Sequence, residues 1–88
     1  MLHDYGVLYG MKSSIPRPIY RRKLGDAIRH RRKARKLSQE KLAEHADVHR
    51  NYIGLIERGE QNITIGSLIK LARALKCKVT DLVVDAGI

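Results

Sequence analysis

Two short helical patterns lie close together in the middle of this chain, and their spacing constrains the fold more than any other feature. Gln39–Ala46 and Arg50–Glu57 are separated by only three residues, so the chain must turn sharply between them. Ser38 is suited to cap the free N–H groups of the first helix, and Asp47 tolerates the left-handed conformation that such a turn requires. Gly59 is well placed to end the second helix. The apolar residues expected to hold the two helices together are Leu42, Val48, Ile53 and Ile56.

The apolar periodicity on either side of this pair predicts three further helices, which makes the chain all-α. We expect a first helix over about residues 20–36, a fourth beginning at Thr64 or Ile65, and a short fifth over about residues 79–84. The fourth helix should contribute most to the core. The core residues predicted in the first and fourth helices are Leu24, Ala27, Ile28, Ala34, Ile65, Leu68, Ile69, Ala72 and Leu75. In the fifth helix, Val79, Leu82 and Val83 either close the core or expose a surface for a partner.

Two prolines just before residue 20 oppose a helix there, so we interpret residues 1–19 as an N-terminal extension or arm. Residues 20–84 then form one small domain and residues 85–88 a short tail, as expected for a chain of 88 residues. Within the extension, a weak alternation of Tyr and Val favours a strand that pairs with its counterpart in a dimer, and disorder is the equal alternative. A natural start at Met11 stays open as well.

The chain is strongly basic, and the basic residues are clustered. The net charge is +9, and ten of the eighteen Lys and Arg residues lie between Arg17 and Lys36, where Asp26 is the only acid. Such a surface attracts a polyanion, because binding releases condensed counterions. A membrane-surface helix would need a broad apolar face opposite the charges, whereas the apolar stripe here is narrow. The charge pattern therefore favours nucleic acid over a membrane.

Other classes of function find little support in the residues. There is no apolar run long enough to span a bilayer and no secretory leader, so we expect a cytoplasmic protein. The single cysteine, Cys77, can form no internal disulfide and is expected to fill space in the core. His45 and His49 have the spacing of metal ligands, but the turn at Asp47 divides them and no third ligand is near. We therefore expect no metal, no cofactor and no enzymatic activity.

The central segment also resembles a known family, the phage-repressor-like helix-turn-helix proteins, also called the Cro/repressor or Xre type. The resemblance runs from about Leu24 to Val83 and rests on LSQEKLAEHADV, the spacing to IERG, and TIGSLIKLARALKCKVTDL. It implies a five-helix, lambda-repressor-like domain that binds a palindromic operator as a homodimer, with the second helix of the motif in the major groove of double-stranded DNA. Three positions depart from the family pattern: Asp47 replaces Gly, His49 replaces a capping Ser or Thr, and Lys76 replaces Gly.

The resemblance and the chemistry of base edges together predict the contact residues. Arg50 and Asn51 stand in the first turn of the expected recognition helix, where Arg can grip guanine and Asn adenine. His49 is a further donor or an imperfect cap, and Leu55 meets a thymine methyl or packs against protein. Gly54 either permits a close approach to the groove or is a neutral surface position. The expected base contacts are Arg50, Asn51, His49 and Leu55, and the expected backbone contacts are Gln39, Tyr52, Arg58, Asn62, Thr64, Arg17, Arg21 and Arg22.

Two of these residues have an alternative structural reading, and one further pair is implied by the resemblance alone. Thr64 is as well suited to cap the fourth helix as to contact DNA, and Gln39 can also brace the start of the recognition helix. The family often buries a carboxylate at the position of Glu57 against an arginine of the first helix, and Arg32 is the matching residue. We expect this salt bridge to be structural.

The function predicted from the sequence is that of a sequence-specific DNA-binding transcriptional regulator, a repressor acting as a homodimer on a palindromic site. The family is prokaryotic or phage-encoded, so the protein is expected at the nucleoid. The alternative is an antitoxin-type protein that binds a toxin or other protein partner as well as its own operator. RNA binding is disfavoured because the chain lacks exposed aromatic residues on which bases stack.

Overall fold

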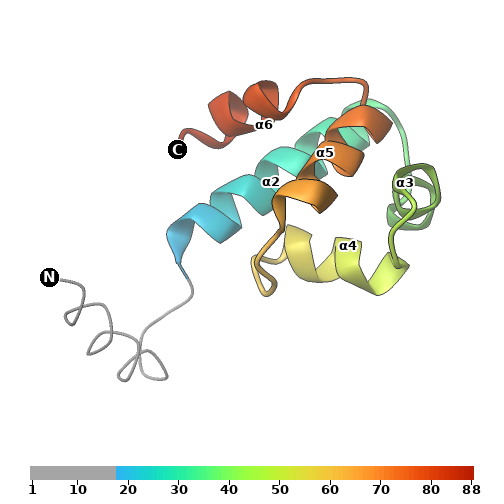
Figure 1. The fold of residues 1–88 in the computed structure, drawn as a ribbon, viewed down its shortest axis with the longest axis horizontal. Coiled ribbons are helices and arrows are strands. Elements are labelled where there is room, and N and C mark those ends of the chain that lie inside the picture. The colour runs from blue at the N-terminus through green and yellow to red at the C-terminus, as the bar shows by residue number, and fades with distance from the viewer. Residues whose placement is uncertain (1–17) are drawn as a thin grey trace, which may run out of the picture.

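The computed structural model describes residues 18–88, which form five helices and no strand (Figure 1). Residues 1–17 of the predicted arm, including Arg17 and the strand-like alternation, lie outside the described residues, whereas Ile19 already belongs to the first helix. No helix within residues 18–88 has the length and apolar character needed to cross a membrane. The helices are α2 (Ile19–Ala34), α3 (Gln39–Ala46), α4 (Arg50–Glu57), α5 (Ile65–Ala74) and α6 (Val79–Ala86).

The longest helix, α2, runs through the middle of the molecule and organises the others. It packs against α6 on one side and against α4 on the opposite side, while α3 contacts both α4 and α5 (Figure 1). Gly25 makes the close approach of α2 and α4 possible, because a Cβ at this position would lie 2.2 Å from the carbonyl oxygen of Ile56. The helix-turn-helix pair is therefore fixed to the rest of the domain at two places, the C-terminal half of α4 against α2 and α3 against α5.

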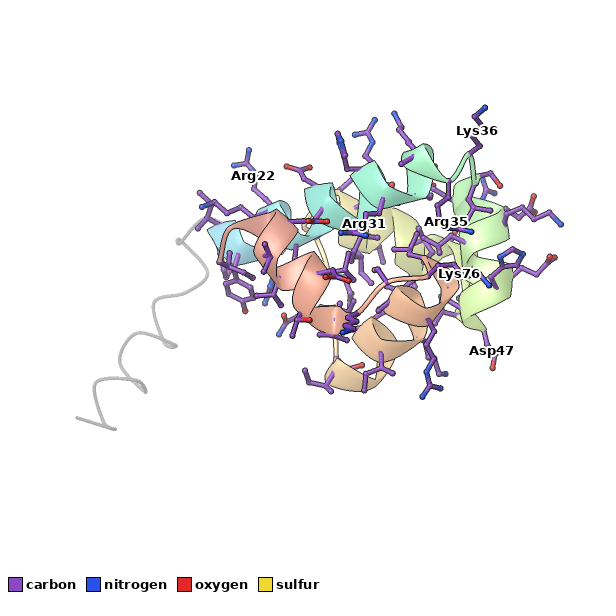
Figure 2. The ribbon with its side chains drawn as sticks, turned by 90° about the horizontal axis from the view of Figure 1, so that it is seen from above. Arg22, Arg31, Arg35, Lys36, Asp47 and Lys76 are labelled. Carbon is purple, nitrogen blue, oxygen red and sulfur yellow. The ribbon has the colours of Figure 1, made fainter. Side chains whose placement is uncertain are left out.

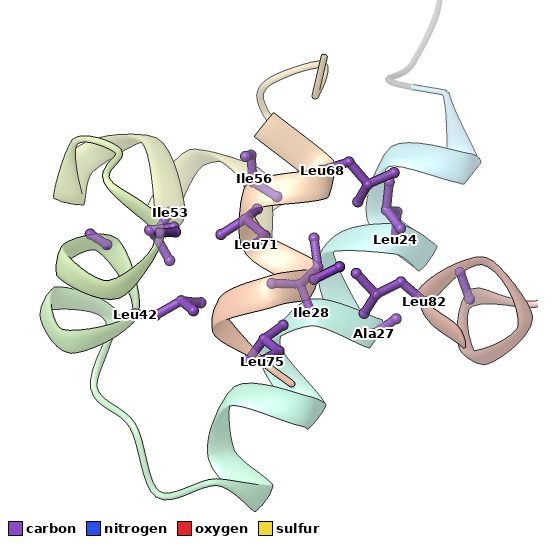
Figure 3. Close-up of a cluster of buried hydrophobic side chains, with 14 residues drawn as sticks. Leu24, Ala27, Ile28, Leu42, Ile53, Ile56, Leu68, Leu71, Leu75 and Leu82 are labelled. Carbon is purple, nitrogen blue, oxygen red and sulfur yellow. The ribbon is translucent and has the colours of Figure 1, made fainter. Parts of the chain in front are cut away.

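All five helices contribute to one core, and the fully buried large side chains come from α2, α3, α4, α5 and α6 in turn (Figure 3). Three predicted core residues were wrong. Ala34 is exposed because α2 ends there, and Ile65 and Ile69 are 69% and 39% exposed because α5 presents a different face to the core. The fully buried residue of α5 is Leu71, which the predicted stripe omitted. The fully buried residues are Ile28, Leu42, Ile53, Leu71 and Leu82.

The helix starts follow the predicted caps. The Ser38 hydroxyl accepts the N–H of Lys41 at 3.0 Å and begins α3. The Thr64 hydroxyl accepts the N–H of Ser67 at 3.1 Å and begins α5. Each bond satisfies one of the orphan donors at a helix N-terminus. The bounds of α3 and α4 agree with the prediction, whereas α2 begins at Ile19, one residue earlier than expected, and α6 continues to Ala86.

The helix ends use residues in the left-handed conformation, and three of them are not glycine. Lys36, Asp47 and Lys76 have φ values of 58°, 56° and 59° and follow α2, α3 and α5 (Figure 2). Lys36 explains why α2 stops two residues earlier than predicted. After each of these residues, the next amide bonds to a carbonyl of the last helical turn, as in the Schellman motif. The left-handed turn predicted at Asp47 is confirmed. Gly59 has the same role after α4, with φ of 70°.

Candidate nucleic-acid interface

The exposed side of α4 forms a shallow hollow of about 450 Å³ at the surface of the helix-turn-helix pair. Arg50 and Asn51 are exposed at its edge, Leu55 is half-buried, and Gly54 is buried. Since Gly54 has no side chain, the backbone of α4 is covered at this point only by neighbouring side chains. The lining residues are Gln39, Arg50, Asn51, Gly54, Leu55 and Arg58. Three predicted contact residues of α4, and Arg58 directly after it, are thus brought together with Gln39 of α3.

His49 caps the N-terminus of α4. Its Nδ1 atom accepts a hydrogen bond from the backbone N–H of Asn51 at 3.2 Å, the bond that Ser or Thr commonly supplies at this position. Only a neutral imidazole with its proton on Nε2 can accept at Nδ1. His49 is therefore a working cap, and its Nε2–H is left as a donor on the exposed side of the helix start.

A buried ion pair lies directly beneath this surface. The Arg32 guanidinium donates from Nε to Glu57 Oε2 at 2.7 Å and from Nη2 to Glu57 Oε1 at 3.0 Å. The two side chains are 10% and 3% exposed, so the pair is almost completely removed from water. Arg32 also donates from Nη1 to the Leu37 carbonyl at 2.8 Å. The structure thus places together the two residues that the resemblance implied, and the pair joins α2 to α4.

Gln39 extends this network to the surface. Its Nε2 donates to Glu57 Oε1 at 3.1 Å, so the amide nitrogen faces the buried carboxylate. Its Oε1 then points toward α4, 3.7 Å from the place that a Cβ on Gly54 would occupy. The orientation of Gln39 is therefore set by Glu57, because a carboxylate accepts hydrogen bonds and cannot donate them. Sequence reasoning recognised Gln39 but not this contact.

The remaining predicted backbone contacts lie around the hollow or beyond it. Tyr52 is half-buried and packs against the core, while Asn62 is exposed in the connection between α4 and α5. Thr64 uses its hydroxyl as the cap of α5. Arg22 at the start of α2 lies beside the turn after α4, since its Cγ is 2.7 Å from where a Cβ on Gly59 would be. Arg21 is half-buried, and its Nε is the buried side-chain atom of residues 18–88 that has no hydrogen-bond partner.

One charged contact on the other side of α2 had no signal in the sequence. Arg31, labelled in Figure 2, donates to the carboxylate of Asp85, and this contact joins α2 to α6 across 54 positions of the chain. This hydrogen bond lowers the pKa of Asp85 and raises that of Arg31. Nearby, burial raises the pKa of the Cys77 thiol, a half-buried side chain that packs against the core. Among residues 18–88 no three His, Cys, Asp or Glu side chains are grouped so as to hold a metal.

The chain is similar to known regulatory proteins over most of its described length. It is 45% identical over 65 residues to the control protein C.SmaI of Serratia marcescens, a match that covers 74% of this chain and 77% of that protein. The crystal structure of the restriction-modification controller C.AhdI from Aeromonas hydrophila superposes with a TM-score of 0.70 at 39% identity, covering 70% of this chain and 94% of that one. The biofilm regulator SinR, solved in complex with DNA, gives 0.66 at 36% identity over 68% and 97% of the two chains. Residues 28–82 also match the family model described as helix-turn-helix. The chain therefore belongs to the helix-turn-helix family.

Proposed function

We propose that this protein is a sequence-specific DNA-binding transcriptional regulator that places α4 in the major groove and represses transcription from its site. The observation that carries the proposal is the hollow on α4, where exposed Arg50 and Asn51 line the same surface as Gln39, whose amide is held by the buried Arg32–Glu57 pair. A groove-reading helix needs polar side chains at base edges and a rigid support. The relatives are transcriptional controllers, which also supports a regulator rather than an enzyme.

The roles of the contact residues follow from their positions. Arg50 offers two parallel N–H donors to guanine O6 and N7, and Asn51 offers a donor and an acceptor to adenine. Leu55 lies one turn beyond Asn51, within reach of a thymine methyl. His49 presents its Nε2–H to the duplex while Nδ1 holds the cap. The residues proposed to contact the DNA backbone are Gln39, Tyr52, Asn62, Thr64, Arg17, Arg21 and Arg22.

A second copy of the chain is the proposed partner, which gives a homodimer on a palindromic site with half-sites about 34 Å apart. The relatives C.AhdI and SinR are regulators of similar size. Ile65 and Ile69 support this arrangement. They are four residues apart in α5, so the two exposed apolar side chains lie on the same side of that helix, which follows α4 in the chain. Replacing both by Ser should shift the protein from dimer to monomer in sedimentation, whereas the exposed Val84 on α6 serves as the control position.

Selection of bound sequences from a pool of random duplexes tests the function directly. We expect a palindromic consensus, and Arg50→Ala should relax the preference at one base position of each half-site at a cost of about 1–3 kcal/mol. Arg73→Ala is the matched control, because it removes the same charge from the exposed end of α5. A pool with no enriched sequence would refute sequence-specific binding. If Arg50→Ala lowered the affinity for specific and for random DNA equally, Arg50 would contact only the DNA backbone.

We place this activity in the cytoplasm of a prokaryotic cell, at the nucleoid. The relatives described above are controllers and regulators and give no support to an antitoxin-type partner. One interaction, with double-stranded DNA, is therefore enough to account for the surface of α3 and α4.

A further inference from the structure

The side chain of Arg58 folds back along α4 instead of extending beyond the end of the helix. Arg58 is the residue that closes α4, and its guanidinium folds back over Gly54, one turn earlier. A Cβ on Gly54 would stand 3.1 Å from Nη1 and 3.9 Å from Cζ of Arg58. The guanidinium therefore rests against the bare backbone of α4, in a space that any other residue at position 54 would narrow.

This placement puts Arg58 on the line of residues that faces the groove. Arg50, Gly54 and Arg58 are spaced four apart, so they follow one another along the same side of the helix. Because the guanidinium of Arg58 is drawn back to the level of Gly54, it lies about 6 Å along the axis from the Cα of Arg50, which is four residues at 1.5 Å each. That separation corresponds to about two base-pair steps of 3.4 Å. Both arginines line the same hollow.

A contact with Glu60 holds the Arg58 side chain in this orientation. Its Nε lies 3.2 Å from Glu60 Oε2, which leaves both terminal nitrogens to donate in parallel. Glu60 is itself fixed by the turn after α4, since its N–H donates to the Leu55 carbonyl at 2.8 Å and Gly59 adopts the positive φ of that turn. The carboxylate also offsets the charge of Arg58. A phosphate contact depends on net positive charge, whereas a base contact depends on directed donors.

We propose that Arg58 reads a base, a guanine about two base pairs from the one read by Arg50, and that Gly54 and Glu60 position it there. This inference rests on the proposed function and replaces the backbone contact that the sequence suggested for Arg58. The absence of a side chain at position 54 then has a role in specificity, because it lets a second guanidinium enter the groove beside the first.

The test compares Arg58→Ala, Arg50→Ala and the wild-type chain on a set of duplexes that carry every single base change in the selected site. Arg58→Ala should lower affinity for the selected site by about 10- to 100-fold and relax the preference at a base pair different from the one affected by Arg50→Ala. Its affinity for random DNA should change by less than about threefold. Arg58→Lys keeps the charge but loses the planar fork, and it should not restore the full preference.

Gly54→Ala separates specificity from folding. The added methyl would lie 3.1 Å from the end of the flexible Arg58 side chain and at ordinary contact distance, 3.7 Å, from Gln39 Oε1. Because Ala favours a helix more than Gly, this variant should unfold at the same temperature as the wild type or higher. It should nevertheless weaken the same base preference as Arg58→Ala, because the methyl displaces the Arg58 guanidinium from its place against the helix backbone.

The outcomes separate the two proposals. Arg58 would be a phosphate contact if Arg58→Ala lowered the affinity for all DNA sequences equally and reduced the salt slope by about one, and if Arg58→Lys restored that affinity. This result would overturn the inference about Arg58 but not the proposed function. An unchanged preference in Gly54→Ala would overturn the positioning role of Gly54. A wild-type chain with no preference at any position would refute the proposed function, and the inference with it.

Discussion

Replacing Glu57 by Ala should cost this protein a large part of its free energy of unfolding. The Glu57 side chain is 3% exposed and accepts two hydrogen bonds from Arg32, which is itself 10% exposed. Without the carboxylate, the buried guanidinium keeps one acceptor within residues 18–88, the Leu37 carbonyl at 2.8 Å. Removing one member of a buried pair costs about 3–5 kcal/mol, because the remaining charge is left without compensation in a site of low dielectric.

That cost is large compared with the stability available. At roughly 0.05–0.15 kcal/mol per residue, a chain of 88 residues is stable by about 4–13 kcal/mol. We therefore expect Glu57→Ala to lower the unfolding midpoint by about 12 °C or more, measured by circular dichroism on heating and by urea titration. Glu57→Gln keeps an acceptor and the volume, and it should fall between Glu57→Ala and the wild type.

The matched control is Asp85→Ala, which breaks the pair with Arg31. Both side chains of that pair are 35% exposed, and water replaces the lost partner, so the loss should be small. Equal unfolding midpoints for Asp85→Ala and Glu57→Ala would refute the reasoning. A second check combines Arg32→Met with Glu57→Leu. This apolar pair should be more stable than Glu57→Ala alone, and failure to recover any stability would show that packing, not the stranded charge, explains the effect.

Three further outcomes test the local geometry. Gly25→Ala should destabilise the fold by about 1–3 kcal/mol or more in urea titrations, since its Cβ would lie 2.2 Å from a carbonyl oxygen. The control, Gly66→Ala, should stabilise the fold by about 0.5–1 kcal/mol, because its Cβ would meet nothing within 4 Å. His49→Ala should lose about 1 kcal/mol in thermal melts through its missing cap, and His49→Ser should recover most of that loss. The hydrogen bond from Arg31 lowers the pKa of Asp85 from its ordinary 3.8. The stabilisation from this pair is therefore complete well above pH 3.8 and is lost as the pH falls through the lower pKa of the folded state. Asp85→Asn should flatten that part of the acid-unfolding curve.

The sequence predicted the parts of this fold that local chemistry determines. The bounds of α3 and α4 agree with the structure because Ser38 and the spacing to Gly59 mark a start and an end that depend on a few neighbouring residues. The left-handed turn at Asp47 was predicted for the same reason. The end of α2 was placed too late, because Lys36 adopts a positive φ that nothing in a lysine side chain announces.

The parts that were missed depend on how helices lie against one another. Periodicity gave α5 an apolar stripe that included Ile65 and Ile69, but α5 turns Leu71 inward and leaves those two exposed. Gly25 carried no signal, because its importance comes from a carbonyl of α4 that is 31 positions away. In the candidate site the residue types were predicted, whereas the direction of the Gln39 amide and the position of the Arg58 guanidinium depend on contacts between elements.

Glu57 has a consequence for how the protein responds to heat. Its Oε1 atom accepts one hydrogen bond from Arg32 of α2 and another from Gln39 of α3. The same carboxylate therefore neutralises a buried charge and orients the Gln39 amide at the hollow. Any opening between α2 and α4 that moves Glu57 also releases Gln39. We therefore expect occupancy of the operator to decline with rising temperature before helical content does, which would make gene expression at this promoter sensitive to mild warming.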